Sequence, residues 1–211
     1  GGGSAWQGSA EVAGFIHYHN TITIPNDENW IIQGIVNPVS GRCLTAVGQK
    51  GAGAVLEGFT LTGGSASQGG GVYLVESSPT LIGCVITGNT TLTNSSDYDG
   101  GGVYVSNASP RFVNCEITLN TAYSHGGGIY ATNSSLDLEG CVISGNTISY
   151  GSCCYSSYGS GGGLYLTGSS AVLTGCEVSG NSCDYQGGGI WGGSLTLTDT
   201  DGADGWGGET Y

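Results

Sequence analysis

The sequence has no methionine, only four prolines and only three basic residues, and none of its apolar runs approaches the length of a membrane span. Because Arg42, Lys50 and Arg111 stand against sixteen acidic residues, the formal net charge is −13. Nucleic acid is a poor partner for such a chain, since it is bound through Lys and Arg, and we expect no membrane insertion in this segment. Without methionine the chain cannot begin at its own start codon, so we expect a processed piece of a longer precursor.

Glycine is abundant instead, with 43 residues, and it marks an internal repeat. The stretch "GGGVYLVESSPTLIGCVITGN" at residues 69–89 returns as "GGGVYVSNASPRFVNCEITLN", "GGGIYATNSSLDLEGCVISGN" and "GGGLYLTGSSAVLTGCEVSGN". In every copy a cysteine follows the last glycine of the triplet by 13 residues and an asparagine follows it by 18. Only the segment between that asparagine and the next triplet varies in length, as expected for a solenoid coil with one variable loop.

Apolar residues within each repeat alternate with period two, in short runs separated by Gly, Ser, Asn and Pro. This pattern predicts strands and no helices. We therefore predict an all-β fold, a right-handed parallel β-helix of about seven coils with three short strands per coil. The predicted single domain spans residues 1–211, with irregular first coils at 1–57, regular coils at 58–191, and an incomplete last coil and acidic tail at 192–211.

The repeated "GGGVY" and "GGGIY" segments, followed by "VITGN", "EITLN" and "VISGN", carry a family resemblance. The chain resembles the pectate-lyase-like superfamily of right-handed parallel β-helices. Its repeats are similar to the GGA(I/L/V) and FxxN repeats of polymorphic outer-membrane proteins, which are surface adhesins and autotransporters. The third glycine stands where that family has Ala, and Ile or Val stands where it has Phe. The resemblance implies the fold and display outside the cell.

Enzymes of this fold use a basic residue beside acidic calcium ligands, or clustered aspartates, and neither pattern is evident here. The three basic residues are scattered, and no metal-ligand spacing joins His17, His19 and His125. The tail "DTDGADGWGGE" resembles a calcium loop through Asp199, Asp201 and Asp204. The candidate is weak, because Ala203 and Thr210 stand where a calcium loop needs ligands. We therefore predict no catalytic residues and no cofactor, with calcium as a weak alternative.

An aromatic residue occupies the second position after each triplet. Period two turns these residues outward, one above another, and they are Tyr73, Tyr104, Tyr130, Tyr165 and Trp191. Such a row is a candidate surface for a glycan or a protein partner. In the alternative interpretation, the rings stack on each other and only stabilise the fold. Both interpretations remain open. Further tyrosines lie in the variable loops, at Tyr98, Tyr123, Tyr150, Tyr155, Tyr158 and Tyr185.

Two side-chain ladders are expected inside the solenoid. The first consists of Cys84, Cys115, Cys141 and Cys176, as stacked free thiols in preference to disulfides. The second consists of Asn89, Asn120, Asn146 and Asn181, each at a corner. In the variable loops, we predict that Cys153 or Cys154 forms a disulfide with Cys183.

The cysteines, the rarity of basic residues and four N-x-S/T sequences favour an extracellular or cell-surface location. The candidate glycosylation sites are Asn94 and Asn107, followed by Asn133 and Asn89. We predict a non-enzymatic structural or adhesive β-solenoid that assembles head to tail with copies of itself. The alternative is a carbohydrate-active enzyme or glycan-binding module that uses the aromatic row and loop acids such as Asp97, Asp99 and Asp184.

Overall fold

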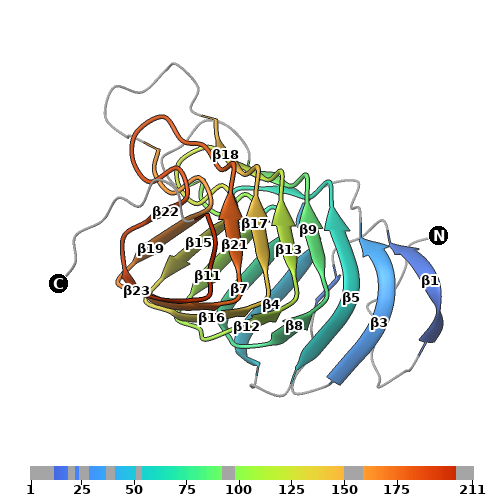
Figure 1. The fold of residues 1–211 in the computed structure, drawn as a ribbon. Coiled ribbons are helices and arrows are strands. Elements are labelled where there is room, and N and C mark those ends of the chain that lie inside the picture. The colour runs from blue at the N-terminus through green and yellow to red at the C-terminus, as the bar shows by residue number, and fades with distance from the viewer. Residues whose placement is uncertain are drawn as a thin grey trace.

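The computed structural model describes residues 12–18, 22–23, 29–36, 41–50, 54–91, 98–149 and 159–202. In these residues the chain is all-β and contains no helix, and therefore no helix that could span a membrane. Every named strand pair is parallel, and the strands stack coil upon coil into three sheets (Figure 1). The predicted parallel β-solenoid is confirmed.

The largest sheet has twelve strands and forks at β5 (Val55–Thr62). Before the fork it contains β1 (Val12–Tyr18) and β3 (Asn29–Val36). One arm contains β8 (Thr80–Ile82), β12 (Arg111–Val113), β16 (Ser135–Glu139), β20 (Ser170–Thr174) and β23 (Ser194–Thr198). The other contains β9 (Val85–Thr87), β13 (Glu116–Thr118), β17 (Val142–Ser144) and β21 (Glu177–Ser179).

The other two sheets are smaller. The seven-stranded sheet contains β2 (Ile22–Thr23), β4 (Leu44–Lys50), β7 (Val72–Ser77), β11 (Val103–Ser106), β15 (Ile129–Thr132), β19 (Leu164–Thr167) and β22 (Ile190–Trp191). The four-stranded sheet contains β6 (Ser65–Ala66), β10 (Thr90–Thr91), β14 (Thr121–Ala122) and β18 (Thr147–Ile148).

The solenoid has about five coils, and the prediction of seven was too high. The described strands within residues 12–36 and 190–198 belong to the two larger sheets only, so no complete coil is described in either stretch. In the first regular coil, β5 runs unbroken through the fork. In later coils the equivalent strand is divided in two, as in β8 and β9, which gives four strands per regular coil where three were predicted. Gly58 within β5 and Gly83 between β8 and β9 both take positive φ, and the residues that follow them, Phe59 and Cys84, are both buried.

Each glycine of a triplet answers a different constraint. Gly100 has φ +67°, a left-handed backbone conformation that residues with a side chain rarely adopt. A Cβ added to Gly101 would lie 2.5 Å from the carbonyl oxygen of Thr121. A Cβ added to Gly102 would lie 2.8 Å from Nδ2 of Asn120. The three-glycine run therefore brings the backbone close to the backbone at Thr121 and to the buried asparagine.

The asparagines form a continuous hydrogen-bonded ladder. Asn120 Nδ2 donates to Asn146 Oδ1 at 3.0 Å and to the carbonyl of Ile86 at 2.8 Å. Asn89 and Asn181 continue the same pattern on either side. A buried amide stabilises a fold only when its groups are paired, and these pair with the coils on both sides.

The four ladder cysteines are buried in the core as free thiols. Cys115 Sγ donates to the carbonyls of Leu81 at 3.4 Å and Val113 at 3.5 Å, and the other three contact equivalent carbonyls. A hydrogen bond with Cys115, followed by burial, raises the pKa of Cys141 to about 12. The Cys141 thiol is therefore neutral, whereas the hydrogen bond with Cys115 lowers the pKa of Cys84. All four sulfurs act as weakly polar core groups.

Candidate functional site

The aromatic row lies on the outer face of the seven-stranded sheet, because the registers of β7, β11, β15, β19 and β22 put its members opposite one another. The first two ring pairs, Tyr73–Tyr104 and Tyr104–Tyr130, have centroids 5.2 Å apart. Tyr130 and Tyr165 are 5.4 Å apart, and Tyr165 and Trp191 are 4.6 Å apart. All four pairs are nearly parallel, with interplanar angles between 4° and 13°.

This stacking bears on the two interpretations of the row. A tyrosine between two stacked neighbours has both faces in contact with other rings, so it offers a ligand mainly its edge and hydroxyl. At the first end of the row, the Arg42 guanidinium covers Tyr73, with its carbon 4.1 Å from the ring centroid. The row therefore stabilises the stack of coils, and its interior rings are poor platforms for a sugar.

A polar column runs beside the aromatic row. It consists of the residue that precedes each triplet, namely Gln68, Asp99, His125, Ser160 and Gln186. Backbone N–H groups of the triplets pair with the carbonyls of the last four of these residues in the next coil, which keeps the column in register. His125 Nδ1 lies 3.1 Å from Asp99 Oδ1, and its ring centroid lies 4.4 Å from that of Tyr165.

Sequence reasoning missed the pairing of Asp99 with His125. The spacing of the three histidines does not reveal it, because the partner of His125 is a carboxylate at the same position of the preceding repeat. Both residues stand three places before the last glycine of a triplet, and that alignment was available in the sequence. Burial and the negative charge of Asp99 raise the pKa of Tyr165, so its phenol stays neutral.

The described loop tyrosines pack partly against each other. Tyr98 and Tyr123 meet edge to face with centroids 6.3 Å apart, and Tyr123 is buried. Tyr185, in contrast, is 53% exposed. The other loop tyrosines, Tyr150, Tyr155 and Tyr158, lie outside the described residues.

Cys183 is partly buried, and its Sγ lies 3.1 Å from the carbonyl oxygen of Gln186. Its predicted partners, Cys153 and Cys154, lie outside the described residues. The loop disulfide therefore stays a prediction.

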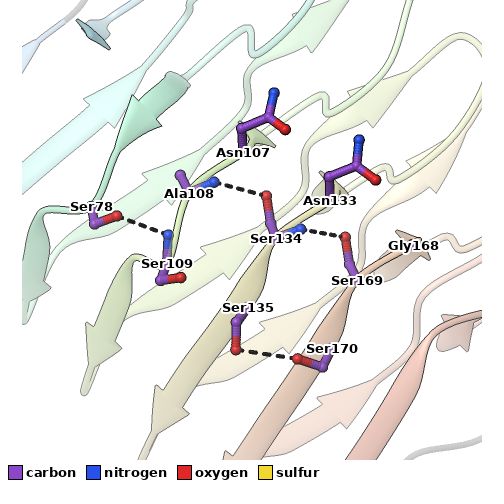
Figure 2. Close-up of a pocket in the computed structure, with 10 residues that line it drawn as sticks. All are labelled: Ser78, Asn107, Ala108, Ser109, Asn133, Ser134, Ser135, Gly168, Ser169 and Ser170. Carbon is purple, nitrogen blue, oxygen red and sulfur yellow. Dashed lines mark hydrogen bonds between the residues drawn. The ribbon is translucent and has the colours of Figure 1, made fainter. Parts of the chain in front are cut away.

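A shallow polar groove of about 760 Å³ follows the corner between the seven-stranded sheet and the β8 arm (Figure 2). Serine hydroxyls order its floor. Ser134 Oγ accepts from the Ala108 N–H at 3.2 Å, and Ser169 Oγ accepts from the Ser134 N–H at 3.0 Å. Figure 2 shows the amides of Asn107 and Asn133 side by side along one rim. The groove thus presents uncharged hydroxyl and amide groups.

The candidate glycosylation sites fall in different environments. Asn107 and Asn133 are exposed, both with positive φ, in the groove just described. Asn89 is only 1% exposed and its amide donates two hydrogen bonds within the ladder, so the folded protein cannot carry a glycan there. Asn94 lies outside the described residues.

The charged residues considered as catalytic or calcium-binding candidates are not gathered at one place in the described chain. Arg111 pairs on the exposed sheet face with Asp137, at 3.0 Å, and with Glu139. Glu116 and Glu177 lie in register on the same sheet but are separated by Val142. No group of three or more His, Cys, Asp or Glu side chains in the described part of the chain is placed to hold a metal ion. Asp97 and Asp204 lie outside it.

Comparison with known proteins agrees with this architecture. Residues 17–201 match the model of a family described as a right-handed β-helix region. No curated protein and no solved structure matches the chain.

Proposed function

The chain belongs to the right-handed β-helix family, and we propose that it is a non-enzymatic structural or adhesive solenoid that assembles head to tail. We further propose that it is displayed outside the cell or on the cell surface. The reasons are its few basic residues, the loop disulfide predicted for Cys183 and its exposed N-x-S/T sites at Asn107 and Asn133.

The observation that carries the assembly proposal is the exposure of Leu197. It lies in register with Leu173, which is fully buried, so both side chains face the solenoid interior. Leu197 is nevertheless 43% exposed, because no described coil covers it. Burying such an apolar face is favourable, and a further β-coil would also pair with β22 and β23, which are the last strands of their sheets on this side among the described residues.

A second copy is the occupant that we propose for this end. A head-to-tail contact joins two different surfaces of the same chain and does not close on itself, so it propagates into a filament. The parallel register of the coils would then continue from one copy into the next.

Sedimentation velocity over a range of concentrations tests this proposal. The wild-type chain should form species that grow with concentration, and Leu197→Glu should sediment as a single copy because a charge in the contact opposes burial. Val172→Glu is the matched control, since Val172 is 41% exposed but lies on the outer face of β20. Wild-type chain that stays a single copy at every concentration, or Val172→Glu that also abolishes growth, would overturn the proposal.

A second candidate function is favoured by the polar groove. Its hydroxyls and amides are the uncharged donors and acceptors that suit a neutral glycan. Retention of the chain on neutral polysaccharide, lost in Asn133→Ala and kept in Tyr73→Leu, would support a glycan-binding module. New ultraviolet absorbance during incubation with polyuronates would instead indicate a lyase.

A further inference from the structure

Trp191 is the last ring of the aromatic row within the described residues. One face stacks on Tyr165 at 4.6 Å and 7°, and its Nε1 donates to Gln186 Oε1 at 3.1 Å. These two contacts fix the orientation of the indole. Its opposite face has no ring of the row against it in the part of the chain that the structure describes, and the residue is partly exposed.

The opposite end of the row shows which group closes such a face. There the guanidinium of Arg42 lies over Tyr73, with its carbon 4.1 Å from the ring centroid. A cation over an aromatic face is attracted by the ring quadrupole, and tryptophan is the strongest of the natural rings in this respect. The indole of Trp191 is therefore a better site for a guanidinium than the phenol that already holds one.

The charge near this end of the solenoid favours a cation as well. The exposed acidic residues of the last described coils are Glu177, Asp184, Asp199 and Asp201. The two arginines with described side chains lie elsewhere, Arg42 over Tyr73 and Arg111 paired with two carboxylates. A surface with this charge attracts a basic partner and repels an acidic one.

We propose that the outer face of Trp191, with the exposed carboxylate of Asp184 from the segment before β22, binds an arginine side chain of a basic protein partner. Asp184 lies two residues before Gln186, which holds the indole, and the exposed Tyr185 stands between them. Arginine fits better than lysine because its planar guanidinium stacks on a ring and pairs with a carboxylate through two N–H groups. The proposal deepens the adhesive function proposed above, and a bound partner would compete with a second copy at the same end.

Calorimetric titration with a capped tetra-arginine peptide tests the site, at a concentration where the chain sediments as a single copy. Trp191→Leu should weaken the affinity about tenfold, and Trp191→Phe, which keeps a ring on the stack, should weaken it less. Asp184→Asn should also weaken binding. Tyr73→Leu is the matched control and should bind as tightly as wild type, because the face of Tyr73 is already occupied by Arg42.

A tetra-lysine peptide of equal charge provides the second comparison and should bind more weakly than tetra-arginine. Equal affinity of the two peptides, unchanged binding by both Trp191 variants, or an equal loss in Tyr73→Leu would overturn the proposal in favour of diffuse attraction to acidic surface. Because the titration uses single copies, its failure is distinguishable from a failure of head-to-tail assembly, which sedimentation reports.

Discussion

Cys43 and Gly64 form a compensating pair: Cys43 stands where the next four coils have the third glycine of the triplet, and Gly64 stands where they have the ladder asparagine. In each of those coils, a Cβ on the third glycine of the triplet would lie 2.8 to 3.0 Å from Nδ2 of that coil's ladder asparagine. Where the asparagine is replaced by Gly64, the space is filled by Cys43. Its thiol lies 3.4 Å from Asn89 Oδ1, which also accepts from the Gly64 N–H at 2.9 Å.

These paired replacements predict energetic coupling between the same two positions in other coils. Gly102→Ala should lower the free energy of unfolding by about 1–3 kcal/mol, because its Cβ meets Asn120 and the carbonyl of Gly128. Gly102→Cys combined with Asn120→Gly imitates the first coil. Its loss should be smaller than the sum of the two single losses, with a coupling energy of about 0.5–3 kcal/mol. Urea denaturation of all four proteins measures this, and strictly additive losses would contradict the account.

Leu119 carries a strained backbone at a corner where the other coils have glycine. Its φ is +56°, its side chain is 67% exposed, and its equivalents are Gly88, Gly145 and Gly180. A left-handed conformation costs a non-glycine residue about 1–2 kcal/mol. Leu119→Gly should therefore raise the free energy of unfolding by up to about 1 kcal/mol after the entropy cost of glycine is deducted.

Leu119→Ala is the matched control for that measurement. It removes the same exposed side chain but keeps a Cβ in the left-handed conformation, so urea denaturation should show no gain. An equal gain in both variants would assign the effect to the exposed leucine and not to the backbone.

Alkaline pH should destabilise the fold through its buried thiols. Burial raises the pKa of Cys43 from 9.0 to about 12, since the core disfavours a thiolate. The unfolded chain loses this proton near pH 9 while the folded chain keeps it, so the thiol's contribution is complete below pH 9 and falls towards pH 12. Each thiol whose pKa is raised in this way lowers the free energy of unfolding by up to about 1.4 kcal/mol per pH unit in this interval.

Denaturation in urea with reductant, at pH 7, 9 and 10.5, measures this dependence. Between pH 9 and 10.5, the free energy of unfolding should fall less steeply with pH in Cys43→Ala than in wild type, because one buried thiol is missing. A wild-type free energy of unfolding that stays constant over that interval would contradict the assignment of Cys43 as a buried neutral thiol.

The loop disulfide is tested by mass spectrometry of an unreduced digest of chain purified without reductant. We expect a peptide that joins Cys183 to Cys153 or Cys154, and ladder cysteines that react with alkylating reagent only after unfolding. Cys183 recovered in alkylated form from the native protein would rule out the bridge.

The fold was predictable because the repeat carries its own geometry. The Gly triplet, the inward Cys and the corner Asn occur at fixed intervals, and alternation fixes which face each side chain takes. The number of coils was overestimated, because counting triplets and their variants does not reveal which segments complete all three sheets.

The site was less predictable, for physical reasons. Alternation shows that Tyr104 and Tyr130 point outward, but not that their rings stack at 5.2 Å with covered faces. The contact between Asp99 and His125 depends on the register of successive coils, which only the alignment of positions before the triplet would have indicated. The compensation between Cys43 and Gly64 could not be predicted, because it depends on their being close in space although they lie beside different sheets.

Electron microscopy of the purified chain at neutral pH, with and without calcium, tests the central claim of a self-assembling structural solenoid most directly. We predict straight, unbranched fibres in both conditions, one solenoid wide, with a meridional spacing of about 4.8 Å from the stacked coils. Discrete rods of a single copy at every protein concentration, in both conditions, would contradict head-to-tail assembly.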